Sequence, residues 1–183
     1  MEVKDGKVGF QGLSFLVNPM DGVIGTAPAG EGVNTGTPGD YGGNLDCTQV
    51  REGSSIHLPV NVEEGLLARG DLHAAMGDGE VGGAAVEING SVEVVVEVIK
   101  DFSYQTPFIE TEDKYISLAS SESIEEANKA DLTVMVDLIM DKTGLSFEDA
   151  LMLMTFKVDL TTCQVVNPAV TMRAEIKKEV LKK

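Results

Sequence analysis

Tryptophan is absent from the sequence, and aromatic residues make up only 5% of its 183 residues. An aromatic platform on which nucleic-acid bases stack is therefore not expected. Basic residues are also scarce, since 14 Lys and Arg stand against 30 Asp and Glu. Five of the 14 basic and two of the 30 acidic residues lie in the last eleven positions, so the first 172 residues carry 9 basic and 28 acidic groups, a net charge of −19. Such a field repels polyanions, and we expect no nucleic-acid partner.

Long apolar runs and paired cysteine motifs are missing as well. The most apolar stretch, residues 92–99, is interrupted by two glutamates and is too short to span a bilayer. The first residues lack the charged-then-apolar pattern of a signal peptide. Cys47 and Cys163 lie far apart and form no CxxC motif. We expect a cytoplasmic protein with no membrane partner and with reduced, buried thiols.

The first half of the chain predicts short strands separated by glycine-rich loops. A long glycine-rich loop covers residues 28–44, and loops of this size inside a domain are usually functional or disordered. The dipeptide Asn89-Gly90 predicts a two-residue hairpin that joins residues 84–88 to residues 91–100. The other strands are expected at residues 8–10, 14–17, 23–27, 55–60 and 66–73.

The second half changes to a helical period. Ser123 and Glu126 form a capping box, and apolar residues then recur at helical spacing up to Gly144. Ser146 opens a second helix. Closing strands are expected at residues 156–160, 164–166 and 170–176. Strands followed by two helices and more strands indicate a β-rich α+β fold, which we divide into a β-rich portion, 1–110, and an α+β portion, 111–183.

Polar groups concentrate in the glycine-rich segment 70–83, which holds His73, one of only two histidines, together with three carboxylates. Glycine allows the backbone to approach a ligand closely. An imidazole with neighbouring carboxylates suits a divalent ion such as zinc, and a free carboxylate can accept a proton from a metal-activated water. The alternative is ordinary Gly-Asp turn chemistry with a hydrogen-bonded histidine.

Residues 70–80, GDLHAAMGDGE, resemble the signature of the acetamidase/formamidase family of amide hydrolases. Four further segments are similar to elements of the same family: PMDGVIG at 19–25, GGNLD at 42–46, HLPV at 57–60 and CQVVNP at 163–168. The resemblance implies a β-sandwich portion followed by an α+β portion with two helices. It also implies hydrolysis of short linear amides, such as acetamide or formamide, with a divalent metal: zinc, with calcium as the alternative.

Family members are longer at the N-terminus, so this chain resembles only their back portion. The resemblance therefore implies either a homo-oligomer or a partner chain that supplies the front portion. Two alternatives stay open. In the first, the chain is a non-catalytic fragment or subunit with an incomplete site. In the second, it is an acidic metal-binding scaffold whose Gly-Asp loops are only structural.

Roles follow from this resemblance for six residues. His73 and Asp46 are the candidate metal ligands, and Glu80 is the candidate general base or a bridging ligand. The candidate substrate-binding residues are Asn44, whose amide would donate to the substrate carbonyl oxygen, together with Gly43 and Asp78. Asp78 has a second possible role, to order its glycine-rich loop. His57 is expected to be structural, and Cys47 is kept as a minor candidate nucleophile.

Overall fold

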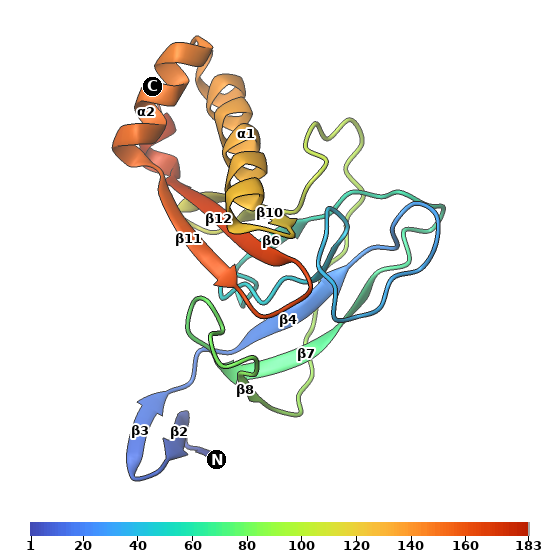
Figure 1. Ribbon diagram of the computed structural model, residues 1–183, viewed down its shortest axis with the longest axis vertical. Helices are drawn as coiled ribbons and strands as arrows, with labels where there is room; N and C mark the ends of the chain where they lie inside the picture. The colour runs from blue at the N-terminus through green and yellow to red at the C-terminus, as the bar shows by residue number, and fades with distance from the viewer. Residues whose placement is uncertain (183) are drawn as a thin grey trace.

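The computed structural model describes residues 1–182 as a β-rich chain with two α-helices, arranged around three antiparallel sheets. This confirms the predicted β-rich α+β class. The first sheet is a meander of β1 (Glu2–Lys4), β2 (Lys7–Phe10) and β3 (Leu13–Leu16). It projects from the rest of the molecule at the N-terminal end (Figure 1). Four of its large apolar side chains are exposed: Phe10, Leu13, Phe15 and Leu16.

The second sheet carries the residues of the predicted site. Its order is β5 (Gly42–Asn44), β4 (Met20–Gly25), β7 (Ala68–Ala75) and β8 (Val86–Glu87). β4 and β5 pack closely, since a Cβ atom on Gly25 would lie 2.5 Å from the backbone nitrogen of Gly43. β7 pairs with β4 so that His73 lies opposite Met20. The sheet thus places the end of the glycine-rich loop and the segment 70–80 on the two sides of β4.

The third sheet has the order β11 (Asp159–Gln164), β12 (Val170–Lys177), β10 (Lys114–Ser121), β9 (Phe108–Glu110) and β6 (Ser55–His57). It includes two strands from the expected first portion, so the sheet crosses the boundary that we placed at residue 110. An isolated bridge between Gly79 and Gln164 joins the loop after β7 to the end of β11.

Both helices begin where the capping residues predict. In α1 (Ile124–Thr143), the Ser123 side chain accepts a hydrogen bond from the Glu126 amide, and Gly144 ends the helix with a φ of 69°. In α2 (Phe147–Lys157), the Ser146 side chain accepts from the backbone amide three residues on. A short 3₁₀ helix, η1 (Lys178–Leu181), follows β12.

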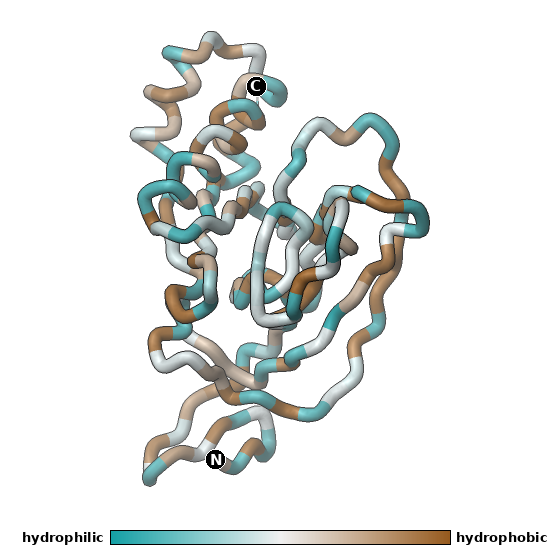
Figure 2. Tube along the Cα trace, turned by 45° about the vertical axis from the view of Figure 1, so that its right-hand side comes forward, coloured by the Kyte–Doolittle hydropathy of each residue, from teal (hydrophilic) through white to brown (hydrophobic). Residues whose placement is uncertain are grey.

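The helices pack together with the third sheet around one apolar core (Figure 1). Polar and apolar segments alternate along them in Figure 2, as expected of helices with one buried face. A second core lies under the strands that carry the site and includes Leu45, Ile109 and both cysteines. Neither described α-helix has the length and apolarity that a membrane crossing requires.

Three predictions of secondary structure are wrong: the hairpin at Asn89-Gly90, the strand bounds 156–160 and the separate strand at 164–166, since the single strand β11 ends at Gln164. Asn89-Gly90 does not form a hairpin, because residues 88–99 adopt no strand and Gly90 does not have a positive φ. A Cβ atom on Gly90 would instead lie 2.9 Å from Leu72 Cδ1, so the chain lies against the Leu72 side chain at this point. The strand expected at 156–160 begins only at Asp159, because α2 continues to Lys157. β9 and β10 were not predicted.

Candidate metal centre

Three predicted site residues meet in one buried cluster. Asp46, which follows β5, His73 in β7 and Glu80 in the next loop each offer one potential ligand atom, and these atoms lie within 4.8 Å of one another. The residues are 2%, 1% and 9% exposed. Asp46 and Glu80 have φ angles of 44° and 43°, in a region that non-glycine residues rarely occupy. Strained backbone of this kind is typical of functional sites.

Two buried polar atoms of the cluster lack a hydrogen-bond partner among the described residues: Oδ1 of Asp46 and Nδ1 of His73. Buried polar atoms are nearly always satisfied, so these two atoms point to a missing partner. Gly22 of β4 leaves the space for one. A Cβ atom there would lie 2.6 Å from Asp46 Oδ1 and 3.0 Å from His73 Cε1. One imidazole and two carboxylates are donors that fit zinc better than calcium, which takes only oxygen ligands.

Asp71 is a site residue that sequence reasoning missed. Its Oδ1 atom lies 3.3 Å from His73 Nε2, and a Cβ atom on Gly22 would lie 2.7 Å from its Oδ2. The carboxylate therefore faces the cluster and orients the imidazole. The sequence did contain a signal for this contact. Residues two apart in a strand share one face, and Asp71 stands two positions before His73.

Asn167 is a second residue that was missed. Its side-chain amide donates to Asp46 Oδ2 over 2.8 Å and to the backbone oxygen of Asn44 over 3.1 Å. The loop between β11 and β12 thereby holds the other carboxylate oxygen of Asp46 and leaves Oδ1 directed at the cluster. Asn167 falls within the family-like element CQVVNP, but nothing local to that element indicates a contact with residues over a hundred positions earlier.

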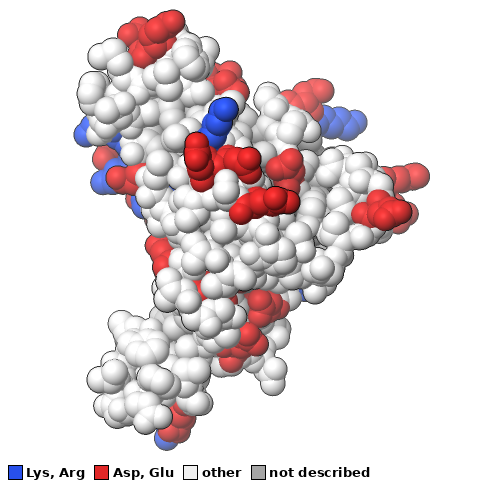
Figure 3. Space-filling model, viewed as in Figure 1, with Lys and Arg blue, Asp and Glu red and all other residues white. Residues whose placement is uncertain are grey.

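The site is electrostatically unfavourable without a cation. Burial, reinforced by the Asp46 carboxylate, raises the pKa of Glu80 to about 7. Burial also raises the pKa of Asp46, although Asn167 and His73 act in the opposite direction. Two carboxyl groups that resist ionisation in the same buried space are the expected partners of a divalent cation. Acidic side chains also outnumber basic ones over the face drawn in Figure 3, which favours the approach of cations.

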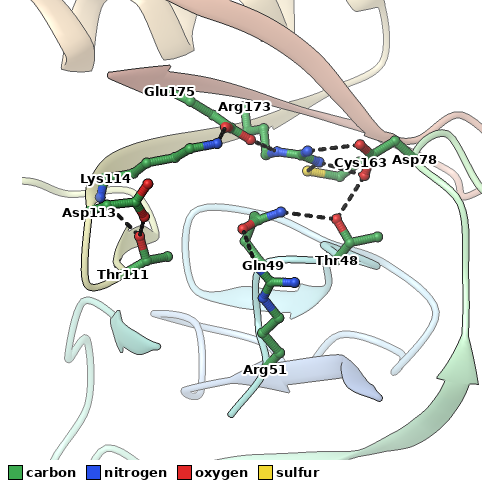
Figure 4. Close-up of polar contacts among 10 residues, drawn as sticks. All are labelled: Thr48, Gln49, Arg51, Asp78, Thr111, Asp113, Lys114, Cys163, Arg173 and Glu175. Atoms are coloured by element: carbon green, nitrogen blue, oxygen red, sulfur yellow. Dashed lines mark hydrogen bonds and ion pairs between the residues drawn. The ribbon is translucent and has the colours of Figure 1, made fainter. Parts of the chain in front are cut away.

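Asp78 anchors the loop that carries Glu80 through contacts with Arg173 and Thr48. Arg173 of β12 donates to both carboxylate oxygens of Asp78 over 2.9 Å, and Thr48 donates to Oδ1 over 2.7 Å (Figure 4). These partners hold the pKa of Asp78 below its usual value, although burial alone would raise it. Arg173 also donates to Glu175 and is itself only 3% exposed. The Asp78 carboxylate is thus engaged in holding the loop.

The remaining candidate residues are Asn44, Gly43, His57 and Cys47. Asn44 is half-buried beside the cluster, and its side-chain oxygen has no described partner. Gly43, with a φ of 87°, lies against the backbone of the long loop, where a Cβ atom would come within 2.7 Å of the Thr37 oxygen. His57 stacks on Phe102, away from the cluster. Cys47 is fully buried in the core, which disfavours a nucleophilic role.

Comparisons with known proteins identify the family of this chain. The model of the Acetamidase/Formamidase family matches residues 12–182. The chain belongs to this family. A formamidase of Methylophilus methylotrophus is 38% identical over 89 residues, a match that covers 48% of this chain and 22% of the formamidase.

Solved structures of the family share the fold. An acetamidase of Bacillus halodurans superimposes with a TM-score of 0.93 at 41% identity, covering 96% of this chain and 60% of the acetamidase. A predicted acetamidase/formamidase of Thermoanaerobacter tengcongensis gives a TM-score of 0.94 at 41% identity, with 98% of this chain and 60% of that one covered. This family member thus spans about three fifths of the length of its solved relatives.

Proposed function

We propose that this chain carries the metal site of an amidohydrolase that cleaves the C–N bond of short linear amides to a carboxylate and ammonia. The observation that carries the proposal is the buried cluster of Asp46, His73 and Glu80, which contains two unsatisfied ligand-type atoms. Its chemistry fits a divalent metal, and the family is named for amide hydrolysis. The relatives, a formamidase and an acetamidase, make formamide and acetamide the first substrates to test.

Asp46 and His73 would hold the cation, with Asp71 and Asn167 orienting them. If bound there, a divalent ion would supply polarisation of the amide carbonyl and a lowered pKa of an attached water. Glu80 accepts the proton of the attacking water and returns it to the leaving nitrogen, a role that suits a carboxyl group with a pKa near neutrality. The amide of Asn44 donates to the substrate carbonyl oxygen. Asp78 and Gly43 shape the loops around the site rather than touching the substrate.

The assembly is part of the proposal. A partner that supplies the remaining portion of the family fold, or a second copy of this chain, completes the enzyme. Two features support an assembly: the coverage of only 60% of the solved relatives, and the projecting N-terminal sheet with its exposed apolar side chains. In Figure 3 this projection is mostly uncharged. The free state of both cysteines supports a reducing, cytoplasmic compartment.

The test separates metal binding from turnover. Zinc binding is measured by calorimetry on the chain, and amide hydrolysis is measured on the chain supplemented with the missing family portion. His73→Ala should lose both zinc and activity. Glu80→Gln should keep most of the zinc while its turnover falls by roughly 100-fold or more. His57→Ala is the matched control, because this histidine stacks on Phe102 outside the cluster, and it should bind zinc normally.

Two outcomes would contradict the proposal. A fully active Glu80→Gln enzyme would remove Glu80 from the chemistry. Zinc binding that survives His73→Ala would place the metal elsewhere. If zinc binds as expected but no activity appears in the supplemented protein, the second candidate, a non-catalytic metal-binding subunit, is favoured.

A further inference from the structure

Four charged side chains form a continuous series from the rim of the third sheet to the loop that carries Glu80. Lys114, at the start of β10, donates to Glu175 Oε2 over 2.6 Å. The other oxygen of Glu175 accepts a hydrogen bond from Arg173 Nε. Arg173 then donates to both carboxylate oxygens of Asp78. Figure 4 shows the four side chains joined in this order, and we call them the ion-pair network.

The ion-pair network is neutral, and its middle members are buried. Two cations alternate with two carboxylates, and the side chains of Arg173 and Glu175 are 3% and 7% exposed. Burial raises the pKa of Glu175, but hydrogen bonds from Lys114 and Arg173 outweigh this effect and hold the pKa below its usual value. Removing one member leaves its neighbour as an uncompensated charge in a buried space. A change at Lys114 therefore reaches Asp78 through the two members between them.

The inner end of the ion-pair network anchors a strained piece of backbone. Asp78 is followed by Gly79, whose amide donates to the Cys163 oxygen over 2.9 Å and whose oxygen accepts from the Val165 amide over 3.2 Å. Glu80 comes next, with a φ of 43°. A non-glycine residue keeps such a conformation only where the surrounding contacts fix it. The Asp78 side chain and the Gly79 backbone supply these contacts, and both attach the loop to the third sheet.

We infer that Lys114 and Glu175 are positioning residues, which hold Glu80 at the cluster through Arg173 and Asp78. The inference rests on the proposed function for the task of Glu80, which is to accept the proton of the attacking water. A general base works only within hydrogen-bond reach of the proton that it takes. A misplacement of about 1 Å can cost about 100-fold in rate. Loosening the ion-pair network should therefore lower kcat.

The candidate metal ligands are held by contacts outside the ion-pair network. Asn167 donates to Asp46 Oδ2 over 2.8 Å, and Asp71 lies 3.3 Å from His73 Nε2. A substitution in the ion-pair network should therefore lower kcat while zinc affinity stays close to that of the wild type. This difference separates a positioning role from a general loss of the site.

Lys114→Met tests the outer end of the ion-pair network. It removes the charge of a side chain that is 31% exposed, so the variant is expected to fold. In the chain supplemented with the missing family portion, kcat should fall by roughly tenfold while KM is unchanged. Lys114→Arg can still donate to Glu175 and should restore most of kcat. Lys177→Met is the matched control and should keep the wild-type kcat, because Lys177 lies opposite Lys114 in the sheet register but its ion pair is with Glu179.

A double variant tests whether the members act as one unit. Glu175→Gln should lower kcat by roughly 10- to 100-fold, because Glu175 is closer to Asp78 than Lys114 is. Adding Lys114→Met to Glu175→Gln should cause no further loss, since the contact through which Lys114 acts is already broken. Losses in kcat that multiply would show that the two residues act independently, which contradicts the inference.

Hydrogen exchange follows the loop without any need for activity. In Lys114→Met, the amides of Gly79 and Val165, which join the loop to β11, should exchange roughly tenfold faster than in the wild type. The amide of Leu138, in the buried part of α1, should exchange at the wild-type rate. A substitution that only lowers global stability would speed up the exchange of all three amides.

Two further results would overturn the inference. One is unchanged exchange at Gly79 and Val165 in Lys114→Met. The other is faster exchange of these amides with a wild-type kcat, because the loop would then move without affecting the reaction. If the wild-type protein binds no zinc or hydrolyses no amide, the proposed function fails instead. The exchange of the loop amides then still decides whether the ion-pair network holds the loop.

Discussion

The buried carboxyl group of Glu80 predicts that the metal-free chain loses stability as the pH rises from about 5 to about 8. Burial first, and then the Asp46 carboxylate, raise the pKa of Glu80 from 4.5 to about 7 in the folded chain. In the unfolded chain the group titrates near its ordinary value. Between these two pKa values the folded state binds more protons than the unfolded state, so a rise in pH favours unfolding.

The size of the effect follows from the two pKa values. Each pKa unit corresponds to about 1.4 kcal/mol, so the full difference between 4.5 and about 7 is worth about 3 kcal/mol. Part of this difference belongs to Asp46, because the two carboxyl groups titrate as a pair. We therefore expect Glu80 itself to cost the folded state on the order of 2 kcal/mol above the upper pKa, and nothing below the lower one.

Glu80→Gln isolates this contribution, because glutamine keeps the size of the side chain and cannot ionise. Urea unfolding of both proteins in the presence of a chelator, at several pH values between about 5 and about 8, gives the two stability curves. Across this range, the free energy of unfolding of the variant should rise relative to that of the wild type by on the order of 2 kcal/mol. His57, whose pKa is lowered by burial, titrates in the same window with the opposite sign but contributes equally to both curves.

Parallel curves for the wild type and Glu80→Gln would refute the reasoning, since they would mean that Glu80 ionises as freely in the folded chain as in the unfolded one. Zinc supplies a second check. A bound cation offsets the charge of the ionised carboxylates, so zinc added near pH 8 should stabilise the wild type more than the variant.

Three further substitutions test the architecture around the cluster. Gly22→Ala should weaken zinc binding by roughly tenfold or more in a calorimetric titration, because its Cβ atom would lie 2.6 Å from Asp46 Oδ1. Gly70→Ala is the control and should bind zinc normally, because the space around its Cβ position is open. Arg173→Met should lower the free energy of unfolding by roughly 3–5 kcal/mol because it leaves two carboxylates without their buried partner, and a loss too small to measure by urea unfolding would contradict that role. Gly144→Ala should cost roughly 1 kcal/mol in thermal unfolding, because this residue ends α1 at a φ of 69°; an unchanged midpoint would show that the cap is not needed.

Features that depend on neighbouring residues could be predicted from the sequence alone. Ser123 and Ser146 start the two helices and Gly144 ends the first one, because each cap acts within four residues of the chain. The block 70–80 and its companion elements indicated the family, which the family model confirms. The change from strand-like to helical periodicity gave the β-rich α+β class. These conclusions need only local hydrogen bonds, periodicity and motif spacing.

Which side chains meet, and how their pKa values shift, depends on contacts between distant parts of the chain. Asp46 and His73 come together because β4 pairs with both β5 and β7, and the burial that raises the pKa of Glu80 comes from elements distant in the sequence. Asp78 finds Arg173 across 95 positions, a pairing that no local pattern contains. The hairpin at Asn89-Gly90 failed for the same reason, since turn chemistry permits a hairpin but the strand beyond it pairs only where a partner strand is available.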